Sequence, residues 1–141
     1  MLKGINPLLS PELLKILCEM GHGDELVLAD ANFPSVSIGQ RVIRADGVHA
    51  NDLLNAILSV FPLDHYVDDH FVLMEVVKGD PVVPTIWEEY NETLKRYDAD
   101  AGVTTIERYA FYERSKKAYA VIATGETAQY GNILIKKGVV K

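Results

Sequence analysis

The sequence is poor in cysteine and has no long apolar run. Its one cysteine, Cys18, cannot form a disulfide within the chain, which is typical of proteins that fold in a reducing compartment. No apolar run approaches the roughly 18 residues of a transmembrane helix, and residues 1–7 lack the apolar core of a signal peptide. We therefore expect a cytoplasmic protein that does not enter a membrane.

Positive charge is also scarce. Lys and Arg number 14 against 20 Asp and Glu, so the formal net charge is −6. A nucleic-acid-binding surface needs clustered Lys and Arg to neutralise phosphates, and the sequence contains no such cluster. We expect no nucleic-acid partner, and a neutral or polar small molecule is the better candidate for a ligand.

Length and composition predict one ordinary folded domain. The chain has 141 residues, of which 48% are hydrophobic and 24% are charged, close to the average for globular proteins. A chain of this length can bury a proper core. Because it contains no repeat, low-complexity tract or obvious linker, we expect a single domain over residues 1–141.

The first helix-like run has a clear start signal and one apolar face. Ser10–Pro11 is typical of a helix N-cap followed by the first helical residue. Leu13, Leu17 and Met20 follow with helical spacing and form one apolar stripe. Cys18 lies in the same run, and we expect it to be buried as a small hydrophobic residue.

Helix-like and strand-like segments alternate along most of the chain. This alternation predicts an α/β fold with a largely parallel sheet between helical layers. The last two strands are joined by a short segment and are candidates for an antiparallel pair. The strands are predicted over Glu25–Ala29, Arg41–Arg44, Phe71–Val77, Thr104–Glu107, Tyr119–Thr124 and Ile133–Ile135, and the helices over Ser10–Met20, Asn51–Phe61, Pro84–Tyr97 and Arg108–Lys117.

His22 is the best candidate for acid/base chemistry. It stands between Gly21 and Gly23, after a helix-like run and before a strand-like one, so its imidazole stays approachable. Histidine has an unperturbed pKa of about 6.5 and can exchange protons near neutral pH. With acidic residues at Asp24–Glu25 and at Asp30, the pattern is compatible with a catalytic site, although from these residues alone a surface histidine is the simpler interpretation.

A second group of polar residues contains residue types that can bind a metal ion. His65, Asp68, Asp69 and His70 fall within six residues of one another. Their spacing matches no known zinc type, and no cysteine accompanies them. We therefore predict no metal here.

Seven short segments, taken together and in order, are more informative than any one of them. In this order they resemble the RbsD/FucU family of sugar mutarotases, and its L-fucose mutarotase branch most closely, from near residue 1 to near residue 138. The segments are Gly21–Glu25, Asp30–Pro34, Ile43–Gly47, Phe111–Arg114, Thr124–Glu126, Tyr130–Leu134 and Lys136–Gly138.

The resemblance implies an isomerase that interconverts the α and β anomers of a free reducing sugar, here L-fucose. It also implies a three-layer α/β/α sandwich with a mostly parallel, mixed sheet. No metal or redox cofactor is expected. Family members assemble into homo-oligomers, often ring-like decamers, with sites near the subunit contacts.

The resemblance also implies roles for individual residues. The catalytic histidine of the family falls on His22, which can protonate the sugar's ring oxygen. Asp69 and Tyr119 are secondary candidates for the site. Substrate-binding positions fall on Asp30, Arg108, Tyr130, Gly131 and Asn132.

Other functions remain open at this point. A ribose-type pyranase performs the same ring opening but closes the ring through a different hydroxyl; Arg108 and Gly131 favour the fucose branch, since the ribose branch usually carries His and Ala there. A sugar-binding accessory protein would keep Asp30, Arg108 and Asn132 without turnover. A turn-capping role for Asp30 and an ion-pairing role for Arg108 are the simpler structural interpretations of these residues.

Overall fold

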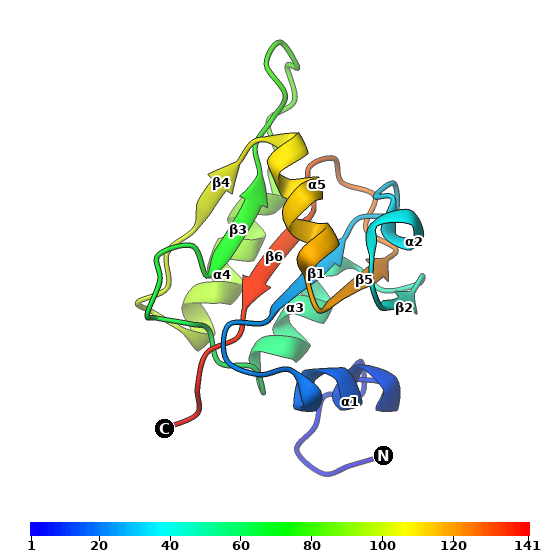
Figure 1. Cartoon of the computed structure of the whole chain (residues 1–141), viewed down its shortest axis with the longest axis vertical. Helices are drawn as coiled ribbons and strands as arrows, with labels where there is room; N and C mark the ends of the chain where they lie inside the picture. Colours follow the sequence, from blue (N-terminus) through cyan, green and yellow to red (C-terminus); the bar gives the residue numbers. More distant parts are fainter.

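The computed structural model describes residues 1–141 and shows a six-stranded sheet with helices on both faces (Figure 1). The helices are α1 (Pro11–Glu19), α2 (Ser35–Ile38), α3 (Ala50–Leu58), α4 (Ile86–Tyr97) and α5 (Arg108–Lys117). The strands are β1 (Glu25–Ala29), β2 (Val42–Ala45), β3 (Phe71–Met74), β4 (Thr104–Ile106), β5 (Ala120–Thr124) and β6 (Ile133–Lys136). No helix combines the length and the apolar character that crossing a membrane requires.

The strand order is β2-β5-β1-β6-β3-β4, and only β6 runs antiparallel to its neighbours. The prediction of a mostly parallel, mixed sheet is therefore confirmed. The expected pairing of the last two strands is wrong, because β2 and β1 occupy both edges of β5. Strand β6 instead crosses to the far side of β1 and lies between β1 and β3.

Two apolar cores, one on each face of the sheet, join the sheet to the two helical layers. Leu26 and Leu28 of β1 point to the face that packs against α1, α3 and α4, whereas Val27 and Ala29 point to the face covered by α2 and α5. All four side chains are fully buried, as expected for a central strand with both faces covered. The three-layer α/β/α sandwich is confirmed.

Helix α1 begins as predicted, but Cys18 does not lie where it was expected. The Ser10 side chain accepts a hydrogen bond from the Leu13 amide at 3.1 Å, which confirms the N-cap. Leu13 and Leu17 are buried. Cys18 is exposed because it follows Leu17 by one position, about 100° around the helix from the buried stripe.

Several element boundaries also differ from prediction. Strand β3 ends at Met74 rather than Val77, because the chain leaves the sheet there and rises as the long loop at the top of Figure 1. Helix α3 begins at Ala50, so Asn51 is not its cap; its side chain accepts a hydrogen bond from the hydroxyl of Thr93 on α4 at 2.9 Å. The four-residue helix α2 was not predicted.

The ends of the strands form two opposite edges of the sheet, which we name the carboxyl edge and the amino edge after the direction of the five parallel strands. The five parallel strands end at one edge, where β6 begins. At the opposite edge β6 ends, between the turn that precedes β1 and the segment that precedes β3. There the Gly23 amide donates to the Lys137 carbonyl at 2.8 Å, and the Asp64 amide donates to the Lys136 carbonyl at 3.1 Å. The end of β6 therefore holds these two segments side by side.

Gly138 makes the closest backbone approach at this second edge. Its amide donates to the Pro62 carbonyl at 2.8 Å. A Cβ at this position would lie 2.7 Å from the Leu63 carbonyl carbon and 3.0 Å from the Asp64 Cα. These are backbone atoms, which cannot move aside as a flexible side chain can.

We expect Gly138→Ala to lower the free energy of unfolding by about 1–3 kcal/mol, because the added methyl group overpacks this contact. Gly47→Ala is the matched control, since a Cβ at Gly47 has no neighbour within 4 Å. Urea unfolding of both variants measures the difference. Equal stability of the two would contradict the close approach at Gly138.

Candidate active site

An open pocket of about 190 Å³ lies at the edge where the parallel strands end. Asp30 directly follows β1, Arg108 follows β4, and Asn132 directly precedes β6. Ligand sites of α/β sheets typically lie outside the carboxyl ends of the strands. The lining residues are Asp30, Asn32, Phe33, Met74, Val77, Asp80, Arg108, Tyr112, Gln129, Tyr130 and Asn132.

Asp30 is a buried carboxylate at the floor of the pocket. Its Oδ1 accepts the Asn32 amide at 3.0 Å, and its own amide donates to the Asn132 Oδ1 at 2.8 Å. Burial raises the pKa of Asp30, and hydrogen bonds from the Asn32 and Phe33 amides and from Asn132 oppose that rise only in part. The Asn132 carbonyl oxygen is thus engaged by the Asp30 amide, and of the two N–H donors of its NH₂ group, one serves the Asp30 carboxylate and one remains for another acceptor.

Tyr130 adopts a backbone conformation that is rare for any residue except glycine, with φ of 59°. Its hydroxyl donates to the Asp80 Oδ2 at 2.6 Å and accepts the Val77 amide at 3.3 Å. Its carbonyl accepts the Trp87 indole N–H at 2.9 Å. Such local strain persists only where several contacts enforce it, and here Asp80 and Trp87 hold the residue from both ends.

The pair of Tyr130 and Asp80 is polarised by its short hydrogen bond. The bond to Asp80 raises the pKa of Tyr130, and the Tyr130 hydroxyl lowers the pKa of Asp80. The hydroxyl proton of Tyr130 is therefore committed to Asp80, and both residues line the pocket.

Gly131 lies behind the pocket, where space is short. Its carbonyl accepts the Tyr90 hydroxyl at 2.7 Å. A Cβ at Gly131 would lie 3.0 Å from the Ala128 carbonyl oxygen, 3.1 Å from the Glu126 Cγ and 3.3 Å from the Tyr90 hydroxyl. Glycine at this position lets the 130–132 turn lie close against α4.

Arg108 lines the pocket, and its guanidinium lies near two aromatic rings. Its Nε donates to the Tyr112 hydroxyl at 3.2 Å, and its guanidinium carbon lies 5.6 Å from the Tyr109 ring centroid and 5.4 Å from that of Tyr112. The hydrogen bond to Tyr112 raises the pKa of Arg108. The remaining donors of the guanidinium fork are free for a ligand oxygen.

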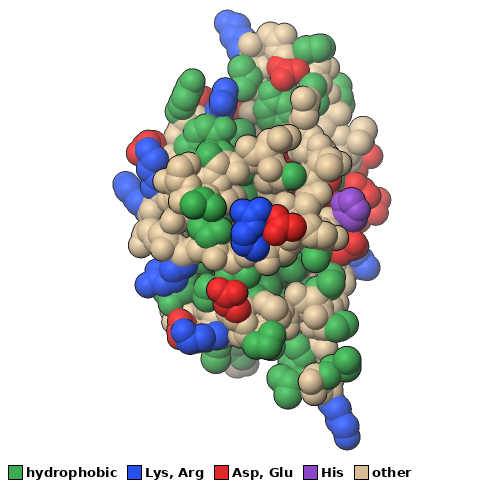
Figure 2. All heavy atoms as spheres, turned by 90° about the vertical axis from the view of Figure 1, so that its right-hand side faces the viewer, with side chains coloured by type: hydrophobic (Ala, Val, Ile, Leu, Met, Phe, Trp, Pro, Cys, Tyr) green, Lys and Arg blue, Asp and Glu red, His purple; other side chains and the backbone are tan.

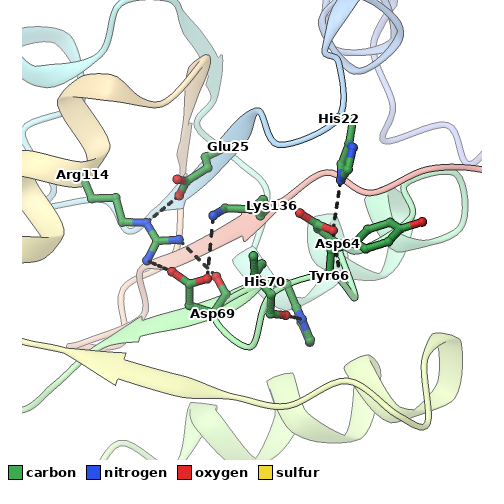
Figure 3. Close-up of polar contacts among 9 residues, drawn as sticks. His22, Glu25, Asp64, Tyr66, Asp69, His70, Arg114 and Lys136 are labelled. Carbon is green, nitrogen blue, oxygen red and sulfur yellow. Dashed lines mark hydrogen bonds and ion pairs between the residues drawn. The ribbon is translucent and has the colours of Figure 1, made fainter.

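His22 lies at the opposite edge of the sheet (Figure 3). Its Nε2 is 3.1 Å from the Asp64 Oδ1, and its ring centroid is 5.4 Å from that of Tyr66. The five residues of β1 separate His22 from Asp30, a span of about 13 Å or more. One chain therefore brings Asp30, Arg108, Tyr130 and Asn132 together but does not bring His22 to them.

The acidic neighbours of His22 in the sequence do not contact its side chain. The Asp24 Oδ2 accepts the Gly21 amide at 2.7 Å, and the Glu25 Oε2 accepts the Arg114 Nε at 2.6 Å. The partner of His22 is Asp64, 42 residues further along the chain, in the segment that precedes β3. No sequence spacing indicates this pair.

The secondary candidates Asp69 and Tyr119 lie outside the pocket. Asp69 pairs with Arg114 at 3.0 Å and lies 3.7 Å from the Lys136 ammonium, at the same edge as His22 (Figure 3). The Tyr119 hydroxyl donates to the Glu19 Oε2 at 3.0 Å, and its ring lies under Arg41, 4.0 Å from the guanidinium carbon. Neither lines the pocket that contains Asp30.

The two histidines of the group at positions 65–70 have different hydrogen-bond partners. The His65 Nε2 is 2.5 Å from the Asp98 Oδ2. The His70 Nδ1 donates to the Val67 carbonyl at 2.9 Å, and its Nε2 accepts the Gly102 amide at 3.1 Å. No group of three His, Cys, Asp or Glu side chains is arranged to hold a metal ion.

The surface carries no basic patch on the face that Figure 2 shows, where Lys and Arg side chains are interspersed with Asp and Glu. The sequence analysis did not name several of the lining residues as site residues, Asp80 and Tyr112 among them. Tyr112 lies within the family segment Phe111–Arg114, which could have indicated it, whereas Asp80 gives no signal beyond a turn. Their contacts with Arg108 and Tyr130 arise only from the fold.

Comparison with known proteins identifies the family of the chain. The model of the RbsD / FucU transport protein family matches residues 3–140. The chain is a member of the RbsD/FucU family. The resemblance seen in the sequence is thereby confirmed.

Relatives in the RbsD/FucU family match along nearly their whole length. The fucose mutarotase of Danio rerio is 56% identical, over 99% of this chain and 94% of the relative. The L-fucose mutarotase of Actinobacillus pleuropneumoniae is 54% identical, over 99% of this chain and 97% of the relative. The solved fucose mutarotase of Streptococcus pneumoniae in complex with L-fucose is 53% identical and superposes with a TM-score of 0.95, covering 99% of this chain and 100% of its own.

Neutralising the carboxylates of Asp30 and Asp80 is expected to change the stability of the fold in opposite directions. Burial raises the pKa of Asp30, so its ionised form destabilises the fold at neutral pH, and this cost disappears as the pH falls through the raised value. The pKa of Asp80 is lowered, so its ionised form stabilises the fold above the unfolded pKa of about 4.

We therefore expect Asp30→Asn to keep or raise the melting temperature at pH 7, and Asp80→Asn to lower it. The Asp30 difference should shrink as the pH falls through its raised pKa, and the Asp80 difference should shrink only below pH 4, as the pH falls towards its lowered native pKa. Thermal unfolding of the two variants and the unmodified protein at pH 7 and pH 3.5 measures this. A lower melting temperature for Asp30→Asn at pH 7 would contradict the cost of its burial.

Proposed function

We propose that the protein is an L-fucose mutarotase, which interconverts the α and β anomers of the free sugar. The observation that carries the proposal is the pocket at the carboxyl edge of the sheet, which combines Asp30, Arg108, Tyr130 and Asn132. It occurs in a chain that is 53% identical to a solved fucose mutarotase in complex with L-fucose.

The chemistry of the pocket suits this sugar. L-Fucose has several hydroxyls and one methyl group. Asp30 supplies acceptor oxygens, Asn132 and Arg108 supply donors, and the Tyr130 ring offers an aromatic face to C–H groups. Phe33, Met74 and Val77 form an apolar part of the lining, which suits a methyl group.

Mutarotation needs one proton to leave the anomeric hydroxyl and one to reach the ring oxygen. The bond between the anomeric carbon and the ring oxygen then breaks, the aldehyde rotates, and the ring closes on its other face. No redox change occurs, and the reaction already proceeds in water. One positioned acid/base contributes roughly 10²–10⁴-fold, so His22 as proton donor to the ring oxygen suffices, without a metal or redox cofactor.

The position of His22 bears on the assembly. Because it lies at the edge opposite Asp30, we propose that the protein is a homo-oligomer, with the decameric ring of the family as the expected form, and that His22 of a second copy completes each pocket. This arrangement is consistent with the half-exposed side chain of His22, 46% accessible in the single chain. We also propose a cytoplasmic location, which the single free cysteine favours.

The mutarotase proposal predicts enzyme-dependent exchange between the α- and β-L-fucopyranose signals in saturation-transfer NMR. We expect His22→Ala to lower this exchange rate by roughly 10²–10⁴-fold while sugar binding persists, because the acid is lost and the pocket is not. Exchange seen only between pyranose and furanose forms of D-ribose would favour the pyranase. Binding of L-fucose without any exchange would leave a sugar-binding protein.

The shared-site proposal predicts complementation between two inactive variants. His22→Ala and Asp30→Asn are each expected to be inactive alone. After they are mixed and subunits exchange, about a quarter of the pockets should combine an intact His22 with an intact Asp30 if the two come from different copies. Persistent inactivity in mixtures whose subunit exchange is verified by native mass spectrometry would place both residues of a working site in one chain.

A further inference from the structure

Arg114 of helix α5 does not line the pocket and takes no part in the proposed chemistry. We propose that Arg114 is a positioning residue for substrate binding: it ties α5 to the amino edge of the sheet and thereby holds Arg108, at the other end of the helix, at the pocket. The proposal rests on the proposed function for the ligand, L-fucose, but not for the geometry of the helix.

Helix α5 carries two residues that line the pocket. Arg108 is its first residue, and Tyr112 follows one turn later on the same face. The Arg108 Nε donates to the Tyr112 hydroxyl at 3.2 Å, so the two side chains are also joined to each other. Their place at the pocket therefore depends on how α5 lies on the sheet.

Apolar packing alone gives this helix little support. Among its ten residues only Phe111 and Ser115 are buried, and the Ser115 hydroxyl donates to the Phe111 carbonyl within the helix at 2.7 Å. Phe111 is thus the one buried apolar side chain of α5, and its ring centroid lies 6.1 Å from that of Phe33. A helix with a single apolar anchor can turn about it unless a second contact fixes its orientation.

Arg114 supplies this second contact (Figure 3). Its Nε donates to the Glu25 Oε2 at 2.6 Å, its Nη1 lies 3.0 Å from the Asp69 Oδ2, and its Nη2 donates to the Asp69 carbonyl at 3.1 Å. Glu25 begins β1, and Asp69 lies just before β3. The ammonium of Lys136, on β6, lies 3.7 Å from the Asp69 Oδ1. Arg114 therefore joins α5 to the amino edge of three neighbouring strands.

The guanidinium fixes the orientation of α5 as well as its position. It is a planar fork whose donors point in set directions, and its hydrogen bonds to carboxylates are stronger than those between neutral groups. The Arg114 and Glu25 side chains are 19% and 20% exposed. Water and salt therefore screen their attraction less than they screen a surface pair.

The contact reaches the pocket through two elements that run between the edges in opposite directions. Strand β1 begins at Glu25 on the amino edge and leads to Asp30 on the carboxyl edge, whereas α5 runs from Arg108 towards Arg114 (Figure 1). Arg114 and Arg108 are separated by about 9 Å along the helix axis. A rotation of the helix about Phe111 would therefore change the distance between Arg108 and Asp30.

The same helix offers a matched control. The Lys116 Nζ lies 2.6 Å from the Glu113 Oε1, but these side chains are 52% and 68% exposed. An exposed pair contributes little, because water screens it. Arg114→Met and Lys116→Met each remove one positive charge from the last turn of α5, and only Arg114→Met removes a side-chain contact with the amino edge.

The binding experiment measures the Kd of L-fucose by calorimetry, and KM and kcat by exchange NMR, at a temperature where each variant is folded. We expect Arg114→Met to raise Kd and KM about tenfold, the contribution of one hydrogen bond to a charged group, with kcat unchanged. Lys116→Met should behave as the unmodified protein. A folded Arg114→Met with an unmodified Kd would overturn the proposal, because a merely structural residue leaves the affinity of the folded protein unchanged.

A double-mutant cycle tests whether Arg114 acts through Arg108. We expect Arg114→Met to add no further rise in Kd once Arg108→Met is present, because the donor that Arg114 positions is already gone. Additive rises would overturn the proposal, as would a lower kcat with an unchanged KM, which would place the effect at the edge of His22. An unmodified protein that binds L-fucose without exchange would instead overturn the proposed function and leave the comparison of Kd values intact.

Hydrogen exchange of the α5 amides provides a test without sugar. Asp69→Asn is the milder variant, because this side chain is 45% exposed and the carbonyl contact with Arg114 remains. We expect faster exchange in α5 for Arg114→Met and Asp69→Asn but not for Lys116→Met, since a helix with fewer contacts to the sheet opens more often. Unchanged exchange in Asp69→Asn would overturn the proposal even where Arg114→Met fails to fold.

Discussion

The insertion of β6 between β1 and β3 is the constraint on which the rest of the molecule depends. A strand that runs against its neighbours must begin where they end, so the Tyr130–Asn132 turn enters the sheet beside Asp30. It must also end where they begin, and there its last residues hold the turn of His22 and the segment of Asp64 together. One reversed strand thus organises both edges of the sheet.

The two edges differ in kind. At the carboxyl edge, a buried carboxylate, an aromatic ring and a guanidinium surround an open pocket whose turn is strained at Tyr130. At the amino edge, a rigid carboxylate supports one half-exposed imidazole. The first edge forms an open pocket lined by polar and aromatic side chains, and the second presents one imidazole to solvent.

Much of this could be predicted from the sequence, and the limits are physical. Alternating apolar segments predicted the layers, the end of a strand-like run pointed to Asp30, and the family resemblance pointed to Arg108, Tyr130 and Asn132. The pairing of β6 was missed because a short connection favours a hairpin unless both edges of the previous strand are occupied. Asp64 was missed because its partner, His22, lies 42 residues away, and only packing brings them together.

The contact behind the pocket has an evolutionary consequence. The Tyr90 hydroxyl both donates to the Gly131 carbonyl and occupies the space that a side chain at position 131 would need. A larger residue at 131 would therefore crowd that hydroxyl, 3.3 Å from the added Cβ, together with Ala128 and Glu126, and would press on a buried hydrogen bond. Positions 90 and 131 are expected to covary among relatives, so that a change in α4, outside the pocket, accompanies a change of ligand preference within it.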